Sequence, residues 1–228
     1  MATVQNVVDE VRAIIHDEVV TYRWSDAELI RYINAGARQT VTLVPEANTV
    51  EQEIALGTSR IARQVLPTGG IKFLKVSRNL LVGEPSSQEG VVRYVEKDAL
   101  DTFDPDWEYV TTEVDSTNYF KHYCHDPREP TVFYLYPPPV VDNKAVSVVF
   151  SQIPVAMTIV GDTIPLEDEY LNALIQYTVY RALTKESRET LPSEFRDELW
   201  QNYLITLGMG RKANEMASPE NVRPPEGA

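Results

Sequence analysis

The sequence predicts an α+β fold: a four-helix bundle built from N- and C-terminal helical hairpins, with an inserted antiparallel β-rich segment and a flexible C-terminal arm. Two observations predict it. Apolar residues recur at helical spacing near both ends of the chain, whereas the middle alternates at the period of strands. Each helix pair is also too narrow to bury its apolar stripe alone, so we expect the two pairs to share one core.

The N-terminal hairpin is predicted from one apolar stripe and one capping pattern. Ser25 and Glu28 have the spacing of a capping box, which predicts that a second helix starts there and ends before Pro45. The first helix is expected over residues 3–17. Its stripe consists of Val4, Val7, Val8, Val11, Ile14 and Ile15.

The middle of the chain changes to short alternating runs that are separated by Gly and Pro residues. One short helix, over residues 96–103, is expected among them. The expected strands cover residues 51–56, 60–66, 71–81, 118–125, 131–136 and 145–152.

The helical period returns near the C-terminus, where helices are expected over residues 171–187 and 193–214. The following segment contains three prolines and few apolar side chains, so it is expected to be a flexible arm. The predicted domains are therefore an N-terminal hairpin, a β-rich insert, a C-terminal hairpin and the arm. Their limits are residues 1–47, 48–160, 161–216 and 217–228.

Composition restricts the function. The net charge of −13 argues against binding nucleic acid through the overall field, because phosphate binding requires clustered Lys and Arg. The single Cys124 excludes an intramolecular disulfide, which fits synthesis in a reducing cytoplasm. No apolar run approaches the ~20 residues of a membrane helix, so we expect no membrane association.

No catalytic, metal-binding or cofactor-binding residue is assigned, and we expect no enzyme. His122 and Cys124 would share one face of a strand and His125 would point to the other face, so only two of them converge, whereas a zinc site needs three or four ligands. The carboxylates of residues 167–169 fit the first turn of a helix, where its dipole favours them. Ser25 lies in no nucleophile elbow.

Aromatic residues are frequent in the β-rich segment. Strand alternation buries about half of such side chains, and exposed aromatics on a sheet often mark an interface. A locally packed β core is an equally good interpretation. The candidate interface residues are Trp107, Tyr109, Tyr119, Tyr123, Tyr134 and Tyr136.

Two stretches resemble the head-to-tail connector, or adaptor, proteins of tailed bacteriophages. The first is Trp24-Ser-Asp-Ala-Glu-Leu-Ile-Arg-Tyr-Ile-Asn-Ala-Gly36. The second is Ile164-Pro-Leu-Glu-Asp-Glu-Tyr-Leu-Asn-Ala-Leu174, which continues through Tyr177, Tyr180-Arg-Ala182, Lys185 and Glu186. The order of helix pair, β insert, helix pair and polar tail is also similar to that family.

The resemblance implies a non-enzymatic virion protein at the head–tail interface, made in the host bacterial cytoplasm. It implies a ring, usually of twelve copies, that contacts the portal protein, itself and downstream tail or nozzle proteins, while DNA passes through without being gripped. It also implies that the C-terminal arm reaches into the portal, although this arm is shorter than in many relatives. The candidate portal-binding residues are Ser218, Pro219, Glu220, Asn221, Val222, Arg223, Pro224 and Pro225.

Two alternatives stay open at this point. One is another neck or tail-completion ring protein, such as a tail terminator, but the polar C-terminal arm favours the adaptor. The other is a soluble hydrolase that uses scattered carboxylates and His122, which no convergent motif supports.

Overall fold

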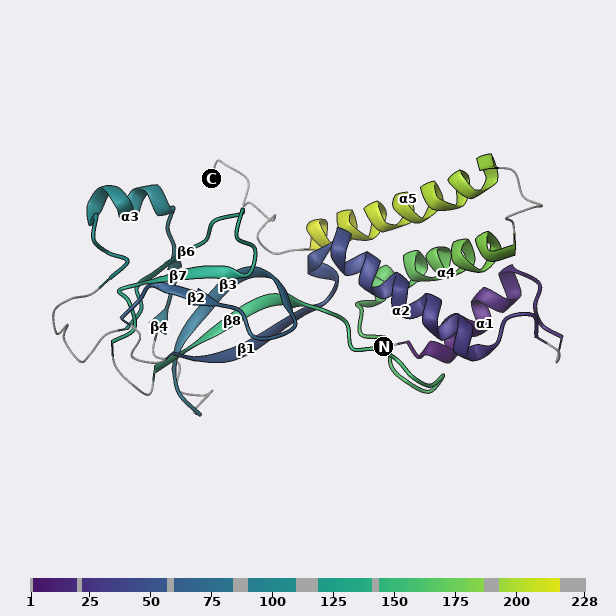
Figure 1. Cartoon of the computed structure of the whole chain (residues 1–228), viewed down its shortest axis with the longest axis horizontal. Coiled ribbons are helices and arrows are strands. Elements are labelled where there is room, and N and C mark those ends of the chain that lie inside the picture. The colour runs from purple at the N-terminus through teal and green to yellow at the C-terminus, as the bar shows by residue number, and fades with distance from the viewer. Residues whose placement is uncertain are drawn as a thin grey trace, which may run out of the picture. The chain divides into compact units, whose positions relative to one another are not determined.

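The structure is a computed structural model that describes residues 2–19, 22–56, 60–83, 90–109, 119–140, 144–186 and 193–217 (Figure 1). The chain divides into two compact units. A helical unit joins Met1–Asn48 to Pro154–Ala228, and a β unit consists of Thr49–Ile153. The finer division into hairpins, insert and arm stays a prediction.

The helical unit is organised around one helix. This helix, α4 (Leu171–Glu186), packs against α1 (Val4–Ile14), α2 (Asp26–Leu43) and α5 (Ser193–Ala217). Short 3-10 turns precede or follow the helices at Pro45–Ala47 and Asp168–Tyr170. The helices therefore begin and end close to where the sequence pattern predicts them.

The four-helix bundle, however, is a wrong description of the fold. The described residues contain five α-helices and two four-stranded sheets, and the two sheets form a compact unit of their own. Burial gives the physical reason within the helical unit. Ala173, Tyr177 and Val179 are all buried, so α4 buries more than one face and is the shared neighbour of three helices. One inward stripe per helix is insufficient to describe this packing.

Local capping accounts for the starts of α1 and α2. Thr3 and Asn6 form a reciprocal capping box at α1, which the sequence interpretation missed. At α2 the Ser25 hydroxyl accepts from the backbone N–H of Glu28 at 3.3 Å, as expected. The Glu28 carboxylate does not complete a box in the described contacts, because it accepts hydrogen bonds from Tyr32 and Lys185.

The β unit contains two sheets. In the first, the order is β1 (Thr49–Leu56), β8 (Lys144–Gln152), β3 (Gly70–Leu81) and β4 (Gly90–Val91), with every neighbouring pair antiparallel. In the second, the order is β2 (Arg63–Val65), β7 (Val132–Tyr136), β6 (His122–Cys124) and β5 (Arg93–Tyr94). β5 and β6 are parallel, so the expectation of a purely antiparallel segment is also wrong. A short helix, α3 (Lys97–Phe103), follows β5.

The core of the β unit lies between the sheets. Phe73 of β3 and Phe133 of β7 stack with ring centroids 5.0 Å apart, which joins the two sheets. Asn79 is buried there, and its amide both donates to the Phe120 carbonyl and accepts from the Phe120 N–H at 2.9 Å. Burying an amide is unfavourable unless its polar atoms are paired, so these two hydrogen bonds fix the position of β3 beside Phe120.

Candidate assembly surface

A buried arginine fixes the start of α2. Arg12 of α1 donates to the carboxylate of Asp17 at 2.9 Å, to the carbonyl of Trp24 at 3.0 Å and to the carboxylate of Asp26 at 2.7 Å. Its side chain is only 6% exposed, and Asp17 also accepts from the backbone N–H of Arg23. The connection between α1 and α2 is thereby held at both of its ends, and α2 begins at a defined position.

The two stretches that resemble phage adaptors meet where α2 packs on α4. A Cβ placed on Gly36 would lie 2.8 Å from Leu174 Cδ1 and 2.8 Å from Tyr177 Cδ1. Real Cβ atoms almost never approach so closely, so glycine permits this helix contact. The close contact aligns the exposed sides of α2 and α4 next to each other.

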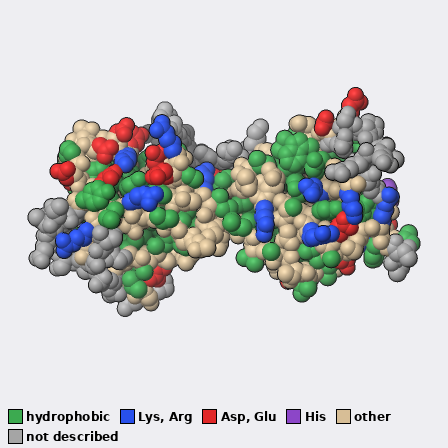
Figure 2. Space-filling model, in the orientation of Figure 1, with side chains coloured by type: hydrophobic (Ala, Val, Ile, Leu, Met, Phe, Trp, Pro, Cys, Tyr) green, Lys and Arg blue, Asp and Glu red, His purple; other side chains and the backbone are tan. Residues whose placement is uncertain are grey.

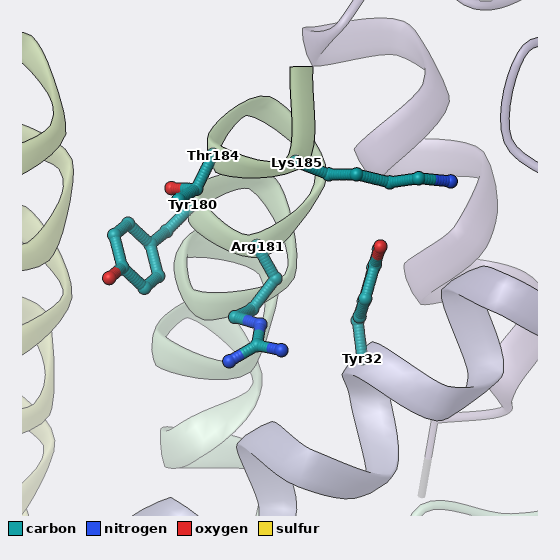
Figure 3. A pocket seen from close by; sticks show the side chains of 5 residues that line it. All are labelled: Tyr32, Tyr180, Arg181, Thr184 and Lys185. Atoms are coloured by element: carbon teal, nitrogen blue, oxygen red, sulfur yellow. The ribbon is translucent and has the colours of Figure 1, made fainter. Parts of the chain in front are cut away.

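A hollow of about 420 Å³ lies on this exposed side. Tyr32 of α2 and Arg181 and Lys185 of α4 line it, together with Tyr180 and Thr184. Figure 3 shows Tyr32 and Lys185 on one side of α4, with Tyr180 directed to the other side. The hollow therefore combines two cations with phenol rings, which suits a carboxylate-bearing partner better than an apolar ligand.

Its electrostatics are set by Glu28. Lys185 donates to the Glu28 carboxylate, and the Tyr32 hydroxyl donates to it at 2.8 Å. These two hydrogen bonds, with that of Lys185 the larger, lower the pKa of Glu28. Desolvation, assisted by the hydrogen bond to Glu28, raises the pKa of Tyr32 to about 12. At neutral pH the carboxylate is therefore charged and the phenol is neutral.

Arg181 is the cation of the hollow whose guanidinium is free to bind a partner. Its guanidinium carbon lies 5.7 Å from the centroid of the Tyr32 ring, within the range of a cation–π contact. It forms no ion pair within the described residues, and its side chain is exposed. Its charge thus remains available at the surface.

An aromatic cluster holds α5 against α4. Tyr177, Tyr180, Trp200 and Tyr203 lie with ring centroids 5.2 to 6.4 Å apart. The hydroxyls of Tyr203 and Thr40 are 3.3 Å apart, and burial raises the pKa of Tyr203. The sequence interpretation missed this cluster, although aromatics three apart on both helices were a usable signal.

The six candidate interface aromatics differ in how deeply they are buried. Trp107 is 2% exposed and donates from its indole N–H to Asp101 at 2.7 Å, and Tyr134 is 8% exposed. Tyr123 and Tyr136 are half-buried, whereas Tyr109 and Tyr119 are 64% and 43% exposed. The interface role stays a prediction, and Tyr109 and Tyr119 have the accessible rings. The candidate arm residues 218–225 lie outside the described residues.

His122 to Cys124 form β6 of the second sheet, and His125 follows the strand. Within the residues that the structure describes, His, Cys, Asp and Glu form no group of three that could hold a metal ion. Cys124 is buried, and desolvation raises the pKa of its thiol to about 12. In the same part of the chain, each helix is too short or too polar to cross a lipid bilayer.

Both adaptor-like stretches thus belong to the helical unit, where α2 and α4 carry most of their residues. A sequence model of the SU10 adaptor protein family matches residues 2–223, so the chain belongs to this family of phage head-to-tail adaptors. A search of curated proteins gave no match. The resemblance seen in the sequence is thus confirmed. The family is structural, occupies the head–tail interface of the virion, and interacts with portal and tail proteins.

Proposed function

We propose that this protein forms a ring of about twelve copies under the portal, where it docks tail components and lines the channel for DNA. The observation that carries the proposal is the family match over residues 2–223. A ring needs one surface of each copy to bind a different surface of the next, with a rotation that closes. A chain that is synthesised in the host cytoplasm must therefore keep these surfaces free until it reaches the portal.

The charge of the chain supports the channel part of the proposal. A net charge of −13 gives a predominantly acidic protein, and acidic walls repel DNA phosphates. DNA that must leave the head rapidly is not held by such a wall. The exposed Arg31, Arg38 and Arg181 of the helical unit are then available for protein contacts.

The arm supports the portal part. Residues 218–228 contain few apolar side chains and three prolines, so they contribute little to a folded core. We propose that residues 218–225 bind the portal protein. Deletion of residues 218–228 should leave the melting temperature of the protein almost unchanged while attachment to portal-bearing heads falls sharply.

The experiment combines purified protein with tailless heads that carry the portal, followed by electron microscopy of the portal vertex. The expected result is a ring at the portal for the full chain and a loss of rings for the chain that ends at Ala217. Rings that form equally well without the arm would contradict its anchoring role. Binding only to heads that already carry another ring would instead assign the protein to a lower neck position.

A further inference from the structure

We infer that the exposed α2–α4 side of one copy binds the start of α5 of a second copy, so that this pair of surfaces joins neighbouring subunits. The inference deepens the proposed ring and rests on it. We use the name basic face for the exposed cations of the two helices, which are Arg31 and Arg38 of α2 and Arg181 and Lys185 of α4. We call the second surface the acidic turn, made of Glu194, Asp197 and Glu198.

The basic face is unusual for so acidic a chain. Arg31 and Arg38 are seven residues apart on α2, and Arg181 and Lys185 are four apart on α4, so each pair projects from one side of its helix. All four side chains are exposed, and Figure 2 shows Lys and Arg side chains gathered on the viewed face of the helical unit. Among the described residues, Lys185 pairs with Glu28, while the three arginines form no ion pair.

The acidic turn has the matching properties. Glu194, Asp197 and Glu198 follow each other at intervals of three and one along α5, so they lie on one side of the helix, and all three are exposed. Only Glu194 lies in the first turn, so the helix dipole does not account for the other two. None of them forms an ion pair within the described part of the chain, and like charges at this spacing repel one another.

Both surfaces belong to one unit, but they do not pair with each other inside it. The three arginines of the basic face and the carboxylates of the acidic turn are unpaired among the described residues of one copy, so they can pair between copies. Such a contact is heterologous, because the face of one copy meets the turn of the next, and this is the contact type that builds rings. Arginine forks suit it, since each guanidinium can hold a carboxylate through two parallel hydrogen bonds.

Charge reversal tests the inference on portal-bearing heads. One variant carries Arg31→Glu and Arg181→Glu, which leaves the Lys185–Glu28 pair intact. A second carries Glu194→Lys, Asp197→Lys and Glu198→Lys. The matched control carries Lys75→Glu and Arg78→Glu, which reverse two exposed cations of β3 in the other unit. Circular dichroism and melting temperature establish that each variant folds.

Each of the first two variants should lower the fraction of heads that carry a ring by roughly tenfold or more, because like charges then face each other at every contact. The control should assemble like the wild type. An equimolar mixture of the two variants should regain rings, since copies that alternate again place opposite charges at each contact. A single chain that carries both reversals should regain them for the same reason.

Three assembly results would overturn the inference and leave the proposed function standing. The first is normal ring assembly by both variants, and the second is folded variants whose rings neither the mixture nor the combined chain restores. The third is loss of rings with the Arg31 and Arg181 reversal only. The last result would assign the basic face to a portal or tail protein. Binding of duplex DNA at physiological salt that disappears with the same reversal would assign it to DNA and overturn the inference too. Wild-type protein that forms no ring on heads would overturn the proposed function itself, and the inference with it.

Discussion

Arg12→Met should lower the free energy of unfolding of the helical unit by ~3–5 kcal/mol, the usual cost of removing one partner from a buried ion pair. Methionine keeps most of the apolar stem but removes the guanidinium that contacts Asp17, Trp24 and Asp26. The Asp17 side chain is 7% exposed, so its carboxylate would be left buried without its cation. Urea unfolding followed by helical circular dichroism and tryptophan fluorescence measures this loss.

Two further variants separate the buried pair from an ordinary surface pair. Arg63→Met removes the partner of Glu129, but those two side chains are 47% and 44% exposed, so we expect a loss of only ~0–1 kcal/mol. Arg12→Met combined with Asp17→Asn should be less destabilised than the two single changes added together, by ~1–3 kcal/mol, because no buried charge is left unpaired and Asp26 is exposed. A loss below ~1 kcal/mol for Arg12→Met, or strict additivity, would refute the reasoning.

Three smaller predictions concern other contacts. Gly36→Ala should lower the free energy of unfolding by roughly 1 kcal/mol in thermal unfolding, because overpacking against α4 outweighs the gain in helix propensity. Gly208→Ala should raise the free energy of unfolding by ~0.5–1 kcal/mol, because a Cβ at this position would have nothing within 4 Å. Cys124, whose pKa is raised to about 12, should react with a thiol reagent at pH 8 only after denaturant is added; fast labelling of the native chain would contradict this. The pKa of Asp162 is lowered because its carboxylate accepts hydrogen bonds from the backbone N–H groups of Thr158 and Ile159. Hydrogen-exchange protection of these two amides should therefore be present above the ordinary pKa of 3.8 and be lost as pH falls below that value. Asp162→Ala should remove this protection at pH 7.

Local signals in the sequence predicted the local structure well. The cap at Ser25 and the break at Pro45 bracket α2, which spans Asp26–Leu43. Strand alternation over residues 145–152 predicted β8, which spans Lys144–Gln152. In each case the signal and the structure that it specifies lie within one element, where periodicity, caps and breakers act directly.

Long-range pairing was not predictable in the same way. β1 pairs with β8, which follows it by about ninety residues, and β5 pairs in parallel with β6; neither pairing leaves a trace in the period of a single strand. The bundle prediction failed for a related reason. It assumed one buried stripe per helix, whereas buried Tyr177 and Val179 place α4 among three neighbours at once. The pairing of Glu28 with Lys185 likewise joins residues that only the fold brings together.

The family resemblance and the proposed contacts between copies depend on different residues of the same two helices. Gly36, Leu174 and Tyr177 lie at the α2–α4 contact, so these parts of the adaptor-like stretches specify how the helices pack. Arg181 belongs to the same stretch but is exposed and contributes little to that packing. Substitutions at the contact should therefore act on folding, whereas substitutions of the exposed charges should act on assembly with the fold intact. That separation makes charge reversal the decisive experiment. A folded protein that no longer builds rings has lost an assembly contact, and recovery of rings in the mixture of the two variants identifies this contact as one between copies.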